Sequence, residues 1–138
     1  MSAPDIKLRE TFDLPREQVL ALYQANKWSS ADKPDALMNH LCKSHTVVTA
    51  WHGERLIGLG NTLSDGELVV YYSHMLVHPE FHGQGVGTRI ARQLMKRYEG
   101  FHQQLLLAVG PSVKFYQNLG FAPTGETRSM WIFPDEEH

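Results

Sequence analysis

One glycine-rich segment, His82-Gly83-Gln84-Gly85-Val86-Gly87, constrains the fold of this chain more than any other feature. It lies between an apolar run, residues 71–77, and a segment from Thr88 onward that has helical spacing. The first N–H groups of a helix have no partner within the helix and lie at the positive end of its dipole, so they attract anions. Glycine permits positive φ and lets a pyrophosphate approach the backbone amides closely. The segment therefore predicts a strand, an anion-binding loop and a helix in succession.

The residues that follow predict a helix with one apolar face. An apolar side chain recurs at every fourth position, in Val86, Ile90, Leu94 and Tyr98. This spacing places the four side chains on one side of a helix, which is then expected to pack inward.

Two common nucleotide-binding templates do not fit the loop. A Walker loop ends in Gly-Lys-Ser/Thr, where this chain has Gly87-Thr88-Arg89. A dinucleotide-binding turn needs a third glycine where this chain has Thr88. The alternative to an anion site is a tight strand-to-helix turn that binds nothing.

Two motifs resemble the GNAT superfamily of N-acetyltransferases. The acyl-CoA loop of that family reads Arg/Gln-x-x-Gly-x-Gly/Ala after a strand ending in Val-x-Pro, and residues 76–87 match it in order. Its Phe-Tyr-x-x-x-Gly-Phe segment is matched by residues 115–121. One position departs from the family: His82 stands where Arg or Gln is usual, so its side chain brings a pH-sensitive donor.

Composition limits the classes of function. With 138 residues, 42% hydrophobic and 20% charged, the chain suits a single domain over residues 1–138. A formal net charge of −2 argues against a nucleic-acid partner. The single cysteine, Cys42, excludes an intrachain disulfide and is expected to be a small core residue. No apolar run is long enough for a signal core or a membrane span, so we expect no membrane partner and a cytoplasmic location.

The pattern along the chain predicts an α/β (α+β) fold. We expect a mixed, mostly antiparallel central sheet of about six to seven strands, flanked by about four helices. The first helix is expected to have Asp13 as its cap, the second to cover residues 35–43, the third to follow the loop, and the fourth to begin at Pro111. Strands are expected at residues 6–12, 45–51, 56–63, 68–77, 104–109, 121–124 and 128–133.

The resemblance implies a sheet splayed open between the strands that end at Val77 and Val109, with acetyl-CoA (CoA) in the wedge. The strand edge near Met75 would pair with the pantetheine arm as an added strand would, and the loop would hold the pyrophosphate. The expected cofactor-binding residues are Met75, Leu76, Val77, His82, Gly83, Gln84, Gly85, Val86, Gly87, Thr88, Arg89, Ser112 and Phe115.

The resemblance also implies catalytic residues for acetyl transfer to an amine. Tyr116 matches the tyrosine that protonates the departing thiolate. An alkylamine has a pKa near 10.4 and arrives protonated, so it needs a base, for which His74 or a water relay lined by Ser73 or Tyr72 is a candidate. Because a strand alternates, only one of Ser73 and His74 is expected to face the site. His74 as a hydrogen-bonded core histidine is the alternative.

Aromatic residues provide candidates for the acceptor site, and we expect Trp28, Tyr23 and Tyr72 to bind substrate. The eight histidines lack the spacing of metal ligands, so no metal is expected. The sequence thus predicts an N-acetyltransferase acting on a small-molecule amine by direct attack, and family analogy adds a homodimer as one expected form. The alternatives are a catalytically inactive acyl-CoA-binding regulatory module and a protein acetyltransferase. The identity of the amine is open.

Overall fold

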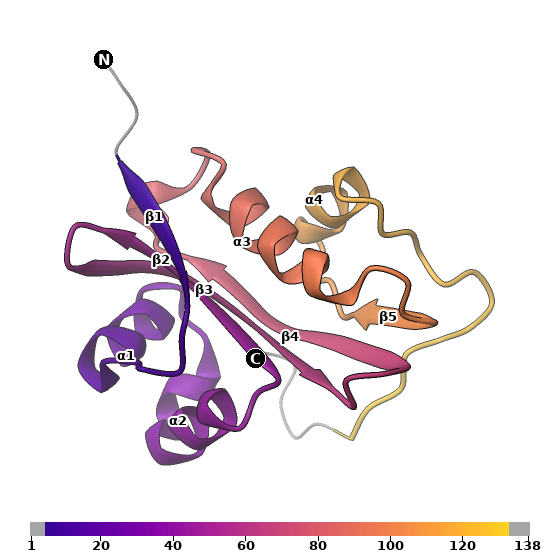
Figure 1. Cartoon of the computed structure of the whole chain (residues 1–138), viewed down its shortest axis with the longest axis horizontal. Coiled ribbons are helices and arrows are strands. Elements are labelled where there is room, and N and C mark those ends of the chain that lie inside the picture. The colour runs from indigo at the N-terminus through magenta and orange to yellow at the C-terminus, as the bar shows by residue number, and fades with distance from the viewer. Residues whose placement is uncertain (1–4, 133–138) are drawn as a thin grey trace.

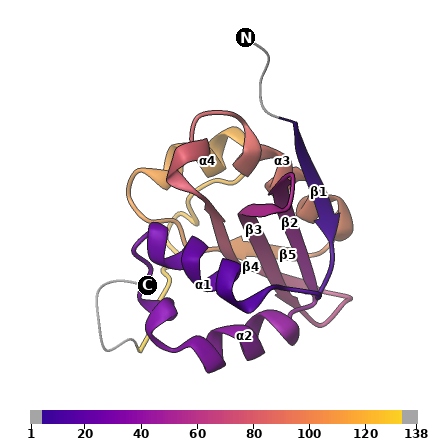
Figure 2. The ribbon, with the colours of Figure 1, turned by 90° about the vertical axis from the view of Figure 1, so that its left-hand side faces the viewer.

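A computed structural model of the chain describes residues 5–132, in which one sheet lies between two pairs of helices (Figure 1). The elements run in the order β1 (Ile6–Glu10), α1 (Arg16–Ala25), η1 (Ser29–Asp32), α2 (Pro34–Cys42), β2 (Thr46–His52), β3 (Arg55–Ser64), β4 (Val69–Val77), η2 (Pro79–Phe81), α3 (Val86–Met95), η3 (Lys96–Tyr98), β5 (Gln103–Leu106) and α4 (Ser112–Asn118). The turned view in Figure 2 shows α1 and α2 on one face of the sheet and α3 and α4 on the other.

The sheet is mixed and mostly antiparallel, as the sequence predicts, but it has five strands in the described part of the chain rather than six to seven. The spatial order is β1-β2-β3-β4-β5. The first three pairings are antiparallel and the last, between β4 and β5, is parallel.

The strands expected at residues 121–124 and 128–132 are absent, and Phe133 lies outside the described residues. Part of this segment forms a local turn, in which the Thr124 hydroxyl donates to the Thr127 carbonyl. Met130 and Ile132 are almost wholly exposed, at 92% and 105% of their reference areas. The apolar pattern is present, but residues 121–132 make no strand pairing, and a strand forms only where a neighbouring strand completes its hydrogen bonds.

The sheet opens between β4 and β5. Pairing joins Val69–Tyr72 to Gln103–Leu106 and stops there, so β4 continues from Ser73 to Val77 with no described strand along that edge. The expected strand 104–109 is shorter than predicted because the Val109 carbonyl serves the turn into α4. It accepts hydrogen bonds from both the backbone N–H and the hydroxyl of Ser112, each at 2.7 Å.

Two local expectations about helices are wrong. Pro15, not Asp13, is the N-cap of α1, and no side chain caps this helix. The Asp13 N–H instead donates to the Thr11 hydroxyl at 2.9 Å. Cys42 is exposed, because α2 buries the face that carries Leu37 and Leu41.

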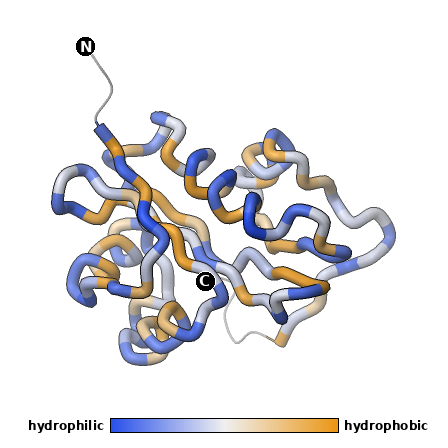
Figure 3. Tube along the Cα trace, viewed as in Figure 1, coloured by the Kyte–Doolittle hydropathy of each residue, from blue (hydrophilic) through white to orange (hydrophobic). Residues whose placement is uncertain are grey.

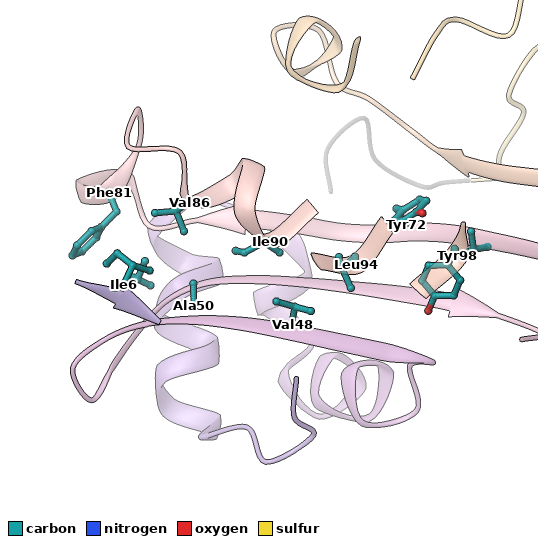
Figure 4. Close-up of a cluster of buried hydrophobic side chains, with 11 residues drawn as sticks. Ile6, Val48, Ala50, Tyr72, Phe81, Val86, Ile90, Leu94 and Tyr98 are labelled. Atoms are coloured by element: carbon teal, nitrogen blue, oxygen red, sulfur yellow. The ribbon is translucent and has the colours of Figure 1, made fainter. Parts of the chain in front are cut away.

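The apolar stripe of α3 packs on the sheet as its spacing predicts. Figure 3 shows apolar and polar residues alternating along this helix. In the close-up of Figure 4, Val86, Ile90 and Leu94 lie over Val48 and Ala50 of β2. Ile90 and Leu94 are fully buried, and burying one such side chain stabilises the fold by about 1.5–3 kcal/mol. This packing fixes the start of α3, and with it the glycine-rich loop.

A glycine in β3 permits the close approach of α3. A Cβ at Gly60 would lie 2.8 Å from Cγ2 of Ile90 and 2.9 Å from Cδ1 of Leu94, both of which are packed core atoms. A side chain here would therefore push the helix away from the sheet.

We expect Gly60→Ala to lower the free energy of unfolding by about 1–3 kcal/mol, because the added methyl overpacks the α3 contact. Denaturant titration measures the change. Gly87→Ala is the matched control, since its Cβ would meet the nearest atom, Cζ of Phe115, at 3.4 Å and alanine favours a helix. Equal stability of the Gly60→Ala protein and the native chain would contradict this account of the packing.

Candidate functional site

A cleft of about 480 Å³ lies where the sheet opens. Its walls come from the end of β4, the loop before α3, the first turns of α3 and α4, and the segment after α1. Thirteen of the residues that the sequence assigns to the site line it, and Asn26 and Phe81 are additions that the sequence does not predict. The lining residues are Asn26, Trp28, Met75, Leu76, Val77, Phe81, His82, Gly83, Gly85, Val86, Gly87, Thr88, Ser112, Phe115 and Tyr116.

The loop presents the start of α3 to this cleft. Gly83 and Gly85 have positive φ, 76° and 79°, and the position of a Cβ at either is open space. Gly85 is the N-cap of α3, and no side chain caps the helix. The amides at its start are therefore available to an anion in the cleft. Arg89 and Gln84 are exposed and do not line the cleft.

The side chain of His82 ties the loop to β4. Its Nε2 lies 2.7 Å from the Val77 carbonyl oxygen. A carbonyl only accepts, so Nε2 carries the proton and donates. The histidine at this unusual position thus links the two walls of the cleft, a role that the sequence does not predict.

On the face of the sheet that α1 and α2 cover, a β-bulge brings two polar side chains of β4 together. Asn61 pairs with His74 and Thr62 pairs with Tyr72, so Ser73 is an extra residue in the ladder. Ser73 contacts His40 of α2, and His74 contacts Tyr23 of α1. The bulge thus interrupts the alternation of the strand and turns both side chains toward α1 and α2, and neither Ser73 nor His74 is among the residues that line the cleft.

His74 lies among aromatic rings beside the cleft. Its Nδ1 is 2.8 Å from the Tyr23 hydroxyl. Its ring centroid lies 5.3 Å from that of Trp28, which lines the cleft, and 4.9 Å from that of His40. His74 is thus connected to the cleft through Trp28.

Two of the expected substrate-binding residues are placed elsewhere. Tyr23 is fully buried and reaches the site only through His74, and burial raises the pKa of its phenol, which therefore stays neutral. Tyr72 is 8% exposed and belongs to the core under α3, where its hydroxyl donates to Gln104 at 2.8 Å. Tyr72 and His74 therefore lie on opposite faces of β4, and Tyr72 is not among the residues that line the cleft.

Three polar residues that the sequence does not predict connect His74 to α2. Asn61 of β3 is fully buried; its Oδ1 accepts from the His74 N–H at 2.8 Å, and its Nδ2 lies 3.1 Å from Nε2 of His40 and 2.8 Å from the Ser44 hydroxyl. The signal in the sequence is an amide within an apolar strand, since a buried polar group needs partners.

Tyr116 of α4 lines the cleft together with the loop. Its ring makes edge contacts with Phe115 and Phe121, with centroids 5.0 and 6.0 Å away. Burial, with a smaller effect of Tyr71, raises the pKa of the Tyr116 phenol. The phenol therefore holds its proton at neutral pH and can donate it.

Within residues 5–132, no three His, Cys, Asp or Glu side chains are grouped to hold a metal ion. None of the described helices is long and apolar enough to cross a membrane.

Comparisons with known proteins agree with this geometry. The family model described as "Acetyltransferase (GNAT) domain" matches residues 11–131. An uncharacterised N-acetyltransferase, ycf52, of Gracilaria tenuistipitata var. liui is 35% identical over 80 residues, which are 55% of this chain and 44% of that protein. The chain thus spans less than half the length of this curated relative.

Solved structures share the fold. A GNAT-family acetyltransferase from Streptococcus pneumoniae TIGR4 has a TM-score of 0.83 and 26% identity, with 95% of this chain and 100% of that chain covered. The structure of AAC(6')-Iy with the bisubstrate analogue CoA-S-monomethyl-acetylneamine has a TM-score of 0.71 and 18% identity, with 95% and 99% covered. The family model covers most of the chain, which therefore belongs to the GNAT acetyltransferase family.

We expect Asn61→Leu to lower the free energy of unfolding by about 1–3 kcal/mol, because the His74 N–H loses its side-chain acceptor and Ser44 and His40 lose the amide donor. Denaturant titration measures this. Asn39→Leu, at an exposed position on α2, serves as the control and should stay close to the native value. The same small effect from both variants would show that the Asn61 hydrogen bonds contribute little to stability.

Proposed function

We propose that this chain is an N-acetyltransferase that moves the acetyl group of acetyl-CoA to a primary amine of a small molecule by direct attack. The observation that carries the proposal is the cleft at the open edge of β4, which is lined by both the glycine-rich loop and Tyr116. Membership of the GNAT family supports it.

The residues present fit CoA. The uncapped start of α3 offers amides to a pyrophosphate, with Thr88 beside them. The edge of β4 from Ser73 to Val77 has no described neighbour and can pair with the amides of a pantetheine arm. Bound CoA would supply the acetyl thioester, and the protein would supply position and proton transfer.

His74 is the proposed base for the amine. An ammonium group must lose a proton before it can attack, and imidazole accepts one near neutral pH. The Tyr23 hydroxyl lies 2.8 Å from Nδ1 of His74 and holds the imidazole ring beside Trp28. Tyr23 then orients the base, as a third group does in other catalytic sites.

Tyr116 is the proposed acid. Transfer of the acetyl group breaks the carbon–sulfur bond and leaves a thiolate, which takes a proton from the phenol. Because burial raises the pKa of Tyr116, the phenol remains a donor throughout the neutral range.

Trp28 forms the proposed aromatic wall for the acceptor, since a ring face attracts a cationic amine. A homodimer and a cytoplasmic location stay predictions. One observation favours a second function, that of an acyl-CoA-binding regulatory module: no carboxylate is among the described residues that line the cleft.

We expect Tyr116→Phe to lower kcat by about 10²–10³-fold, because the thiolate loses its proton donor. The Kd for CoA should stay within about twofold, since the phenyl ring still fills the site. Thiol release from acetyl-CoA with a panel of primary amines measures kcat, and calorimetry measures the Kd. Gln117→Ala, exposed on α4, is the control for both measurements.

Two outcomes would count against this assignment. Full activity of the Tyr116→Phe protein would remove Tyr116 from the mechanism. Tight CoA binding by the native chain without turnover of any amine would favour the regulatory module.

We expect His82→Ala to raise the Kd for CoA by roughly fivefold, because the loop loses its hydrogen bond to Val77. Calorimetric titration of CoA measures this. His102→Ala, an exposed histidine before β5, is the matched control and should bind CoA as the native chain does. Equal affinities of all three proteins would show that this hydrogen bond does not support the site.

A further inference from the structure

His40 of α2 lies next to both polar residues of the β4 bulge. Its Nε2 is 3.1 Å from the Ser73 hydroxyl oxygen, and its ring centroid is 4.9 Å from that of His74. The same Nε2 is 3.1 Å from Nδ2 of Asn61 on β3. Side chains of β3 and β4 thus meet at this one nitrogen atom of α2.

The backbone N–H of His74 fixes the directions of the hydrogen bonds around His40. The backbone N–H of His74 only donates, so the side-chain atom of Asn61 that faces it is the oxygen. The amide nitrogen of Asn61 must then face His40 and Ser44. Since an amide nitrogen only donates, Nε2 of His40 holds a lone pair, and the ring is neutral with its proton on Nδ1.

Ser44 and Ser73 make the remaining hydrogen bonds of this network. Ser44 donates its hydroxyl proton to the His40 carbonyl at 2.9 Å, so its oxygen is the acceptor for Asn61. Ser73 lies 3.1 Å from the same Nε2, which has no hydrogen to donate, so the Ser73 hydroxyl donates there and shares the single lone pair with the Asn61 amide. The Ser73 oxygen then has only lone pairs left for a further partner, and no other hydrogen bond to it forms within residues 5–132.

Burial supports a neutral His40 by lowering its pKa. The titratable groups around it are His74 of β4 and, beyond that ring, Tyr23 of α1, which burial also keeps neutral. Asn61 and Ser73, which contact it from β3 and β4, do not titrate. A neutral His40 leaves the neighbouring His74 able to take up a proton without repulsion between two imidazolium rings.

We propose that His40 is a positioning residue: its unprotonated Nε2 holds the Ser73 hydroxyl and thereby presents the Ser73 oxygen as an acceptor for the ammonium group of the substrate, beside His74. This inference rests on the proposed function and deepens it. An ammonium group has only donors, so the Ser73 oxygen selects for it as a hydrogen-bond acceptor while His74 takes the proton.

The test compares His40→Ala, His40→Gln and Ser73→Ala. His40→Ala and Ser73→Ala should each raise the KM for the amine by about tenfold, because each variant loses one hydrogen bond to the amine. The Kd for CoA should stay unchanged. His40→Gln should recover most of the loss, because its side-chain oxygen accepts from Asn61 and Ser73. Its pH–rate profile should keep the acidic limb of the native enzyme, since His40 takes up no proton. His102→Gln is the matched control.

Two kinetic outcomes would overturn the proposal. A native KM in His40→Ala would show that His40 does not position Ser73. A His40→Gln enzyme as impaired as His40→Ala, without an acidic limb, would make His40 itself the base. Absence of turnover by the native chain with every amine would instead refute the proposed function and its substrate together.

A second measurement needs no turnover. Nitrogen-15 NMR of the native chain should show His40 with hydrogen on Nδ1. In Asn61→Asp, the carboxylate keeps the acceptor for the His74 N–H but replaces the donor to His40, so the pKa of His40 should rise by about one unit or more. Hydrogen on Nε2 in the native chain, or an unchanged pKa in Asn61→Asp, would overturn the assigned hydrogen bonds whether or not the chain is an acetyltransferase.

Discussion

The parting of β4 from β5 after Tyr72 is the constraint on which the rest of the site depends. A strand edge without a neighbour carries unpaired N–H and C=O groups and can pair with another extended molecule. The opening also forms the cleft, because β4 continues to Val77 while the chain after β5 turns away into α4. One interrupted ladder thus provides both the volume of the site and a row of hydrogen-bonding groups along its wall.

The two faces of β4 make different contacts beside this opening. On the face of α3, Gly60 lets Ile90 and Leu94 approach the sheet, and this contact anchors the helix whose first turn meets the cleft. On the other face, the bulge at Ser73 turns two successive side chains toward α1 and α2. Packing therefore positions the glycine-rich loop and the start of α3, and buried hydrogen bonds position Ser73, His74 and His40.

Burial favours the neutral form of three titratable groups in and around the cleft. The phenols of Tyr23 and Tyr116 both have a raised pKa because they are buried, and the pKa of His40 is lowered for the same reason. Burial disfavours the charged form of each group, whichever sign that charge has. Because these groups are neutral, hydrogen bonds rather than ion pairs orient them, and the orientation of Asn61 is fixed by the His74 N–H.

Features that depend on local spacing can be predicted from the amino-acid sequence. These are the glycine-rich loop, the apolar stripe of α3 and the mixed, mostly antiparallel sheet, because strand and helix periods and positive φ act over a few residues. Which distant residues meet depends instead on how the whole chain packs. His40, Asn61 and Ser73 lie on three elements, and a single bulge in the ladder brings them together. The missing strands after Phe121 have the same cause, since a strand forms only where another strand completes its backbone hydrogen bonds, and no local pattern specifies that partner.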